Sequence, residues 1–135
     1  MLVDGKWSAV WQPVQATDAK GGFVRQVSTF RSFVTPDGAP GPTGEGGFKA
    51  APGRYHLYAA FICPWATRTL IARKLKGLEA VVTFAIAEPA LSDEGWRFGD
   101  YPGAGRDTVN GATYLHEIYT RADPHFTSRA TVPAL

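Results

Sequence analysis

Tyr55-His-Leu-Tyr-Ala-Ala-Phe-Ile62 is an apolar and aromatic run without helical spacing, which is typical of a strand largely buried in a sheet. Cys63-Pro64-Trp65-Ala66 follows it directly. Pro64 suits the first turn of a helix, because its missing N–H is no loss there. Beyond it, apolar side chains recur at i, i+4 and i+7: Ile71, Leu75 and Leu78. We therefore predict a strand over residues 55–62 and a helix that begins at Pro64.

Cys63 is the only cysteine, and the predicted junction places it at a helix N-terminus. Free backbone N–H groups and the positive end of the helix dipole favour a thiolate there. Ala66 fills the second position of a Cys-x-x-Cys motif, so an oxidised Cys63 needs an outside thiol to resolve it. A lone cysteine is more often a small buried hydrophobe, but burial gives no reason for Cys-Pro at this junction. We interpret Cys63 as a candidate nucleophile.

The rest of the chain reads as strand, loop and helix. Residues 80–87 are β-branched and apolar, which predicts a second strand buried on both faces. A strand, helix and strand in this order predict a right-handed parallel crossover, with Cys63 at the carboxyl end of the sheet. Residues 88–112 form a long loop, and residues 111–121 predict a second helix. Upstream, residues 1–22 read as an extended arm, 23–35 as a packing strap and 36–53 as an irregular Gly/Pro-rich loop.

Composition limits the class of protein. With 135 residues, 44% of them apolar, the chain is long enough for one modest domain. The net charge is +2 and basic and acidic residues are interspersed, so the sequence shows no basic stripe for binding nucleic acid. No apolar run approaches membrane-spanning length. One cysteine and the lack of a signal-like first segment indicate a cytoplasmic protein. His56, His116 and His125 show no ligand spacing, so we expect no metal.

Several motifs together resemble the glutathionyl-hydroquinone reductases, also called xi-class glutathione transferases. The resemblance runs over nearly the whole chain. It rests on Gly53-Arg-Tyr-His-Leu-Tyr58, Cys63-Pro-Trp-Ala66, Arg68-Thr-Leu-Ile71, Arg73-Lys-Leu-Lys-Gly-Leu-Glu79, Gly95-Trp-Arg-Phe98, Tyr101-Pro-Gly103, Val109-Asn-Gly-Ala112, Tyr114-Leu115, Ala122-Asp-Pro124 and Thr131-Val-Pro133.

The resemblance implies an α/β, thioredoxin-like βαβα core of the glutathione transferase N-terminal type. It implies that Cys63 forms a mixed disulfide with glutathione while a glutathionyl-hydroquinone is reduced. It also implies that Trp96, Arg129 and Val132 contact glutathione, with a cis bond before Pro133. Pro64 and Trp65 would shape the Cys63 loop. Thr67 departs from the histidine usual at its position in the family.

The resemblance also predicts a division of the chain. Residues 1–53 would be an N-terminal arm and Gly/Pro-rich loop, and residues 54–135 a partial glutathione-binding domain. The final hairpin and helix of that domain, and the family's all-helical C-terminal domain, would be absent. A homodimer or association with the missing C-terminal half would then be the expected assembly.

Two alternatives stay open. An omega-type or glutaredoxin-like thioltransferase shares the Cys-Pro start and the single thiol, and would act on protein mixed disulfides or dehydroascorbate. A non-catalytic thioredoxin-like fragment or assembly module would carry an inert Cys63. Glutathione and a glutathionyl-hydroquinone are the small-molecule partners of the leading hypothesis.

Overall fold

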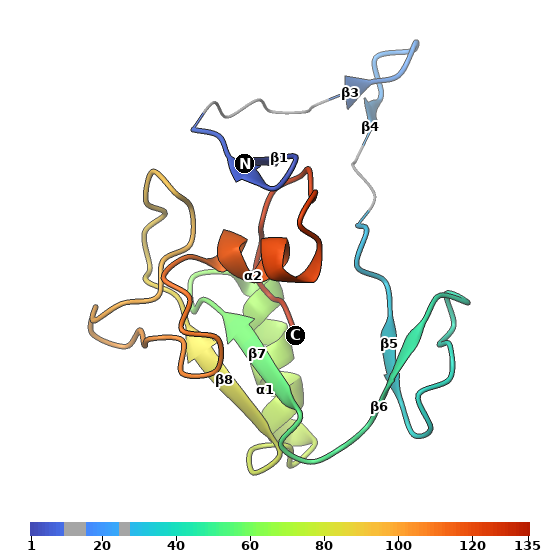
Figure 1. The fold of residues 1–135 in the computed structure, drawn as a ribbon, viewed down its shortest axis with the longest axis vertical. Coiled ribbons are helices and arrows are strands. Elements are labelled where there is room, and N and C mark those ends of the chain that lie inside the picture. Colours follow the sequence, from blue (N-terminus) through green and yellow to red (C-terminus); the bar gives the residue numbers. More distant parts are fainter. Residues whose placement is uncertain (10–15, 25–27) are drawn as a thin grey trace. The chain divides into compact units, whose positions relative to one another are not determined.

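The computed structural model describes residues 1–9, 16–24 and 28–135, which form two compact units (Figure 1). The first unit consists of Met1–Trp11 and Pro52–Leu135, and the second of Gln12–Ala51. This grouping differs from the expected boundary at residue 53, because the first residues hydrogen-bond to residues 126–128 of the first unit. Residues 10–15 of the predicted arm and 25–27 of the predicted strap lie outside the described residues.

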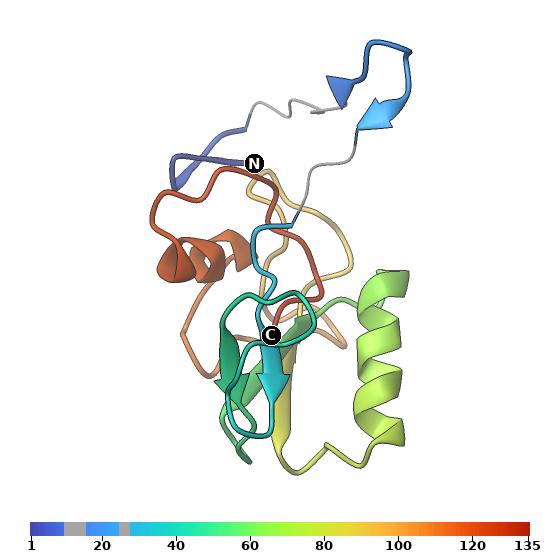
Figure 2. The same cartoon turned by 90° about the vertical axis from the view of Figure 1, so that its right-hand side faces the viewer.

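The first unit is built on two parallel strands joined by a helix (Figures 1 and 2). Strand β7 (Tyr55–Ala59) pairs with β8 (Val82–Ile86), from Tyr55 opposite Val82 to Ala59 opposite Ile86. Helix α1 (Pro64–Leu75) connects them. The predicted order of strand, helix and parallel strand is confirmed. The core on these elements is apolar: Leu57, Tyr58, Ala59, Ala60, Ala66, Ala85, Ile86, Ala87, Phe98, Leu115 and Val132.

Both strands are shorter than the sequence indicated. β7 is largely buried, as predicted, whereas β8 is less buried than predicted. β7 ends at Ala59 because the chain then turns, with the Cys63 N–H donating to the Ala60 carbonyl at 3.0 Å. In β8 only the last two residues are buried, and Phe84 is exposed beneath the Arg73 guanidinium, 4.8 Å from its ring centroid. Burial of the second strand on both faces was therefore a wrong prediction.

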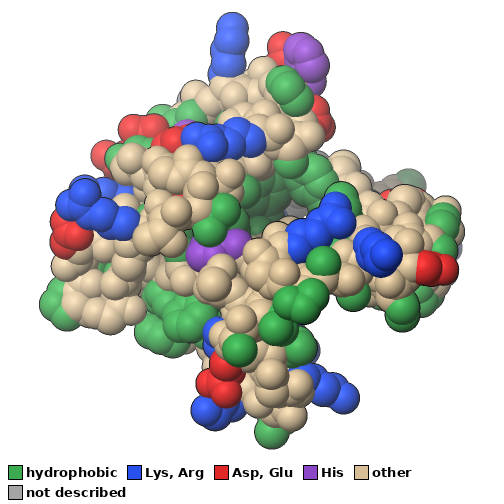
Figure 3. All heavy atoms as spheres, turned by 60° about the horizontal axis from the view of Figure 1, so that its bottom comes forward, with side chains coloured by type: hydrophobic (Ala, Val, Ile, Leu, Met, Phe, Trp, Pro, Cys, Tyr) green, Lys and Arg blue, Asp and Glu red, His purple; other side chains and the backbone are tan. Residues whose placement is uncertain are grey.

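Helix α1 begins and ends where the sequence predicts. Pro64 occupies its first turn, and Gly77 follows it with φ 65°, a conformation that glycine adopts readily. The predicted apolar face is largely exposed, however, with Leu75 80% exposed and Ile71 52%. The buried residue of the helix is Ala66. Figure 3 shows hydrophobic side chains at several places on the surface, with basic and acidic side chains interspersed.

Helix α2 (Leu115–Ala122) starts later than the predicted residue 111. Residues 107–112 instead wrap around the Asp107 carboxylate, as described below. Glu117 then accepts a hydrogen bond from the Tyr114 N–H through Oε1 at 3.0 Å, which satisfies a backbone donor at the start of the helix. Asp123 follows its last residue.

The two ends of the chain complete the first unit. The Val132–Pro133 peptide bond is cis, as the resemblance implies. Beyond it Ala134 exchanges two backbone hydrogen bonds with Tyr58, of 2.8 and 3.1 Å, so the chain end lies antiparallel to β7. At the other end, β1 (Leu2–Val3) and β2 (Lys6–Trp7) form an antiparallel hairpin.

The second unit contains two small sheets. β3 (Ala16–Thr17) pairs antiparallel with β4 (Phe23–Val24), and β5 (Phe33–Thr35) pairs parallel with β6 (Gly47–Lys49). The sequence did not predict β6, since its Gly/Pro-rich surroundings read as irregular. A Cβ at Gly47 would overlap the carbonyl oxygen of Ala39, so the close approach of this strand depends on glycine.

Among the described residues no helix is long and apolar enough to cross a membrane. Nor does any group of three or more His, Cys, Asp or Glu side chains within the described ranges have the arrangement of a metal site.

Candidate functional site

Cys63 is the residue at which β7 leads into α1. It is the N-cap of that helix, with φ −93° and ψ 113°, and its carbonyl accepts the Thr67 N–H at 2.9 Å. Its side chain is half-buried against the core, and the Sγ–H donates to the Val132 carbonyl at 3.6 Å. A thiol at this position is accessible from outside and also touches the segment that contains the cis-proline. It can therefore attack a sulfur that is held against that segment.

Val132 and Pro133 form the second part of the site. Val132 is buried, and its carbonyl faces the Cys63 sulfur. The residue before it is fixed by Tyr119 of α2, whose hydroxyl donates to the Thr131 carbonyl at 2.7 Å and accepts the Thr131 N–H at 3.3 Å. This role of Tyr119 was not predicted, since its position in the sequence indicated only an apolar helix face. Arg129 lies exposed three residues before Val132.

Trp96 approaches the same core from the long loop. Its side chain is half-buried against the buried cluster that Cys63 also touches. Its carbonyl accepts the Leu115 N–H at 2.9 Å, and Phe98 donates to the Thr113 carbonyl at 2.8 Å. The loop segment around Trp96 is thus attached to the start of α2. The structure brings Cys63 and Val132 into direct contact, while Trp96 and Arg129 lie on separate segments of the same unit.

The surface next to Cys63 is apolar. Phe61, Ile62 and Trp65 are each more than half exposed, and the Arg68 guanidinium lies 5.8 Å from the Trp65 ring centroid. The Thr67 hydroxyl is directed toward the backbone, donating to the carbonyls of Phe61 and Cys63 at 3.3 and 3.1 Å. It therefore supports the turn before Cys63.

A shallow pocket of about 190 Å³ lies beyond the carboxyl end of β8. Its lining is mostly apolar and aromatic: Phe61, Ile86, Ala87, Pro89, Tyr101, Pro102, Gly103 and Ala104. Since Phe61 belongs to the turn that leads to Cys63, the pocket and the thiol lie at the same edge of the sheet.

A polar cluster of Tyr58, Asp107 and Asn110 links β7 to the loop before α2. The Tyr58 hydroxyl donates to Oδ1 of Asp107 at 3.2 Å and accepts from Nδ2 of Asn110 at 2.7 Å. Burial alone raises the pKa of Asp107, but hydrogen bonds from the N–H groups of Ala112, Asn110 and Val109 outweigh burial and lower it. Burial raises the pKa of Tyr58 and lowers that of His56, whose Nδ1 lies 2.7 Å from the Thr83 hydroxyl.

Comparison with known proteins places these features in context. No family model matches the chain. The glutathionyl-hydroquinone reductase YqjG of Escherichia coli is 49% identical over 135 residues, which are 99% of this chain and 40% of that protein. The corresponding enzyme PcpF of Sphingobium chlorophenolicum is 40% identical over 135 residues, covering all of this chain and 39% of that protein. This chain thus spans about two-fifths of the length of these curated relatives.

The solved structures agree. The glutathione-bound structure of Escherichia coli YqjG has a TM-score of 0.80 at 44% identity, over 98% of this chain and 37% of that one. The xi-class glutathione transferase of Phanerochaete chrysosporium has a TM-score of 0.72 at 38% identity, over 82% of this chain and 36% of that one. The predicted α/β, thioredoxin-like fold of the glutathione transferase N-terminal type is confirmed.

Proposed function

Because the chain is related to the glutathionyl-hydroquinone reductases, the xi class of glutathione transferases, we propose that it is the glutathione-binding part of such a reductase. The observation that carries the proposal is the contact between the sulfur of Cys63, at the start of α1, and the carbonyl of Val132, which precedes the cis-proline Pro133. A glutathione sulfur held against the Val132 backbone would lie within reach of the thiolate.

The proposed reaction has two steps. The Cys63 thiolate attacks the glutathione sulfur of a glutathionyl-hydroquinone, forming an S–S bond as the bond between sulfur and ring carbon breaks. The ring carbon takes the electron pair and a proton, and the hydroquinone leaves. A second glutathione thiolate then attacks the Cys63–glutathione disulfide, which releases oxidised glutathione and restores the Cys63 thiolate. The lack of a second cysteine in this chain is consistent with that scheme.

Other residues receive proposed roles from the resemblance to the xi-class glutathione transferases. Trp96, Arg129 and Val132 would contact glutathione, with Pro64, Trp65 and Pro133 shaping the backbone around Cys63. The apolar pocket beside Phe61 is suited to an aromatic ring, since it is lined by aromatic and apolar side chains. We also propose a cytoplasmic location, since the second step consumes reduced glutathione.

Intact-mass analysis after exposure to a glutathionyl-hydroquinone tests the proposal, with hydroquinone release followed in parallel. We expect a glutathione adduct on the wild-type chain, an equal amount of released hydroquinone, and loss of the adduct when glutathione is added. Cys63→Ser should show neither adduct nor release. A folded wild-type sample that forms no adduct would refute catalysis by this chain.

A second candidate is a thioltransferase of the omega type. The observation that favours it is the similarity of this chain to the omega-like glutathione S-transferase 2 of Schizosaccharomyces pombe. The two are 41% identical over 115 residues, which are 85% of this chain and 34% of that protein. Comparing the rate on a glutathionyl-hydroquinone with that on a glutathionylated peptide separates the candidates. Faster turnover of the peptide would favour the thioltransferase.

A further inference from the structure

The N-terminal hairpin β1–β2 contacts both of the segments that carry the proposed glutathione contacts. One edge of the hairpin meets the loop that leads to Trp96, and the other meets the segment that leads to Arg129 and Val132. The sequence indicated only an extended arm here.

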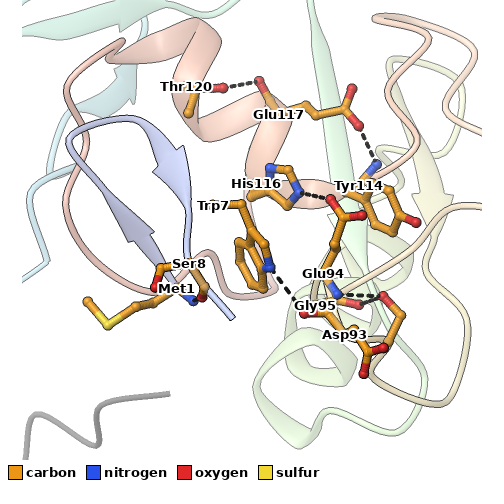
Figure 4. Close-up of polar contacts among 11 residues, drawn as sticks. Met1, Trp7, Ser8, Asp93, Glu94, Gly95, Tyr114, His116, Glu117 and Thr120 are labelled. Carbon is orange, nitrogen blue, oxygen red and sulfur yellow. Dashed lines mark hydrogen bonds and ion pairs between the residues drawn. The ribbon is translucent and has the colours of Figure 1, made fainter. Parts of the chain in front are cut away.

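Trp7 makes the contact with the loop. Its indole N–H donates to the Asp93 carbonyl at 3.1 Å, as Figure 4 shows. The loop passes so close to the ring that a Cβ at Gly95 would lie 3.2 Å from the Cη2 atom of Trp7. Gly95 also has φ 84°, a conformation that side chains disfavour. The turn immediately before Trp96 therefore rests against the indole.

The same indole is stacked on the start of α2. The Trp7 and His116 ring centroids are 4.8 Å apart, and those of His116 and Tyr114 are 5.4 Å apart with only 7° between the planes. Nε2 of His116 lies 3.5 Å from Oε2 of Glu94 (Figure 4). Since Trp96 follows this turn and accepts the Leu115 N–H, its backbone is held on both sides.

The other edge of the hairpin is attached to residues 126–128. The Leu2 N–H donates to the Ser128 carbonyl at 2.9 Å, and the Gly5 N–H donates to the Phe126 carbonyl at 3.0 Å. The Asp4 N–H donates to the Thr127 hydroxyl at 2.8 Å. Leu2 is fully buried, so this edge is also packed. The segment continues directly into Arg129 and Val132.

We propose that the hairpin is a positioning element of the glutathione site, and that Trp7 is the positioning residue that fixes Trp96 relative to the 126–132 segment. Trp7 acts on the site through the Asp93–Gly95 turn. The identity of the ligand rests on the proposed function, whereas the positioning itself can be measured without any ligand.

Three variants of the full chain test the proposal. Trp7→Leu removes both the stacking and the indole N–H, and Trp7→Phe keeps a ring but removes the N–H. Val3→Ala is the matched control, since Val3 belongs to the same hairpin and is 48% exposed. Circular dichroism and thermal melting establish that each variant is folded.

The measurements are hydrogen exchange at the Leu115 N–H, glutathione affinity by calorimetry, and the rate of Cys63 alkylation by iodoacetamide. For Trp7→Leu we expect faster exchange and a loss of glutathione affinity of roughly two- to thirtyfold, the range in which substitutions that act indirectly on a site change its energetics. Trp7→Phe should fall between Trp7→Leu and the wild type, and Val3→Ala should match the wild type. The alkylation rate should change less than about twofold, whereas general loosening of the fold would expose the thiol and raise it.

Each outcome decides between the two proposals. If folded Trp7 variants exchange and bind glutathione like the wild type, the positioning role is refuted and the proposed function stands. If the wild type itself binds no glutathione while exchange at Leu115 still rises in Trp7→Leu, the proposed function fails and the hairpin remains a structural clamp only. If Trp7→Leu does not fold, the exchange and affinity of Trp7→Phe decide the question.

Discussion

Asp107 is the residue that holds together the loop before α2. It is 6% exposed, and its carboxylate accepts the N–H groups of Val109 and Asn110 through Oδ1 and that of Ala112 through Oδ2. The Tyr58 hydroxyl of β7 adds a fourth hydrogen bond. A buried carboxylate is stable only with donors of this kind. The conformation of the loop therefore depends on the negative charge of Asp107 as well as on the shape of its side chain.

Asp107→Asn should lower the free energy of unfolding by about 2 to 3 kcal/mol, because the amide replaces one acceptor with a donor facing backbone N–H groups. Urea unfolding measures the change. Asp100→Asn is the matched control in the same loop, since Asp100 is exposed and its ion pair, at 2.6 Å, is with the exposed Arg106. That variant should hardly alter the unfolding midpoint. Equal effects of the two substitutions would contradict the role given to Asp107.

At the scale of single residues, the sequence indicates what local context determines. The residues around Cys63 were enough to predict its place at a strand-to-helix junction. The motif Thr131-Val-Pro133 was likewise enough to predict the cis bond before Pro133. Asp107 and Trp7 do not, because their partners lie far away in the chain: Tyr58 is 49 positions from Asp107, and Asp93 is 86 positions from Trp7. The motif Asp107-Thr-Val-Asn-Gly111 carries a weak turn signal that could have singled out the acid.

At the scale of elements, hydrophobic patterning predicts β7, α1, β8 and α2 in the right order, but it does not predict which faces become buried. Leu75 repeats at helical spacing and is nevertheless 80% exposed. The short strands β1, β2 and β6 were missed because two or three residues are too few to show a period of two. Their pairing depends instead on partners that only the folded chain supplies.

The turn of the N-terminal hairpin gives a prediction for an element. Gly5 and Gly77 both have positive φ, of 72° and 65°. A Cβ at Gly5 would overlap the Pro124 carbonyl, whereas one at Gly77 would meet nothing within 4 Å. Gly77→Ala should therefore cost about 1 kcal/mol for the backbone conformation alone, and Gly5→Ala about 1 to 3 kcal/mol more for the overlap.

Thermal unfolding of the two alanine variants measures that difference. Gly5→Ala should also raise hydrogen exchange at the Leu2 N–H, because the hairpin can no longer approach the 124–128 segment. If Gly5→Ala were no more destabilising than Gly77→Ala, the hairpin would not be docked as described.

At the scale of the whole molecule, two histidines with pKa values shifted in opposite directions contribute to the pH dependence of stability. Burial lowers the pKa of His56, and its Nε2 has no hydrogen-bond partner among the described residues. A hydrogen bond to Asp4, 2.7 Å from Nδ1, followed by the charges of Asp4 and Asp123, raises the pKa of exposed His125. In the unfolded chain both imidazoles have a pKa of about 6.5. His56 therefore stabilises the fold above that pH and loses the contribution as the pH falls, while His125 stabilises it below that pH and loses the contribution as the pH rises.

These opposite slopes predict a shallow pH dependence for the wild type between about pH 5 and 7, since the two contributions partly cancel. Asp4→Asn removes the His125 contribution, so its free energy of unfolding should fall more steeply than that of the wild type as the pH decreases through this range. His56→Gln should do the reverse and become relatively more stable at the acidic end. Urea unfolding at several pH values measures the slopes, with Asp93→Asn as a control that removes the same charge from another surface loop. If Asp4→Asn and Asp93→Asn gave the same slope, the contact between the hairpin and His125 would not contribute to the pH dependence of folding.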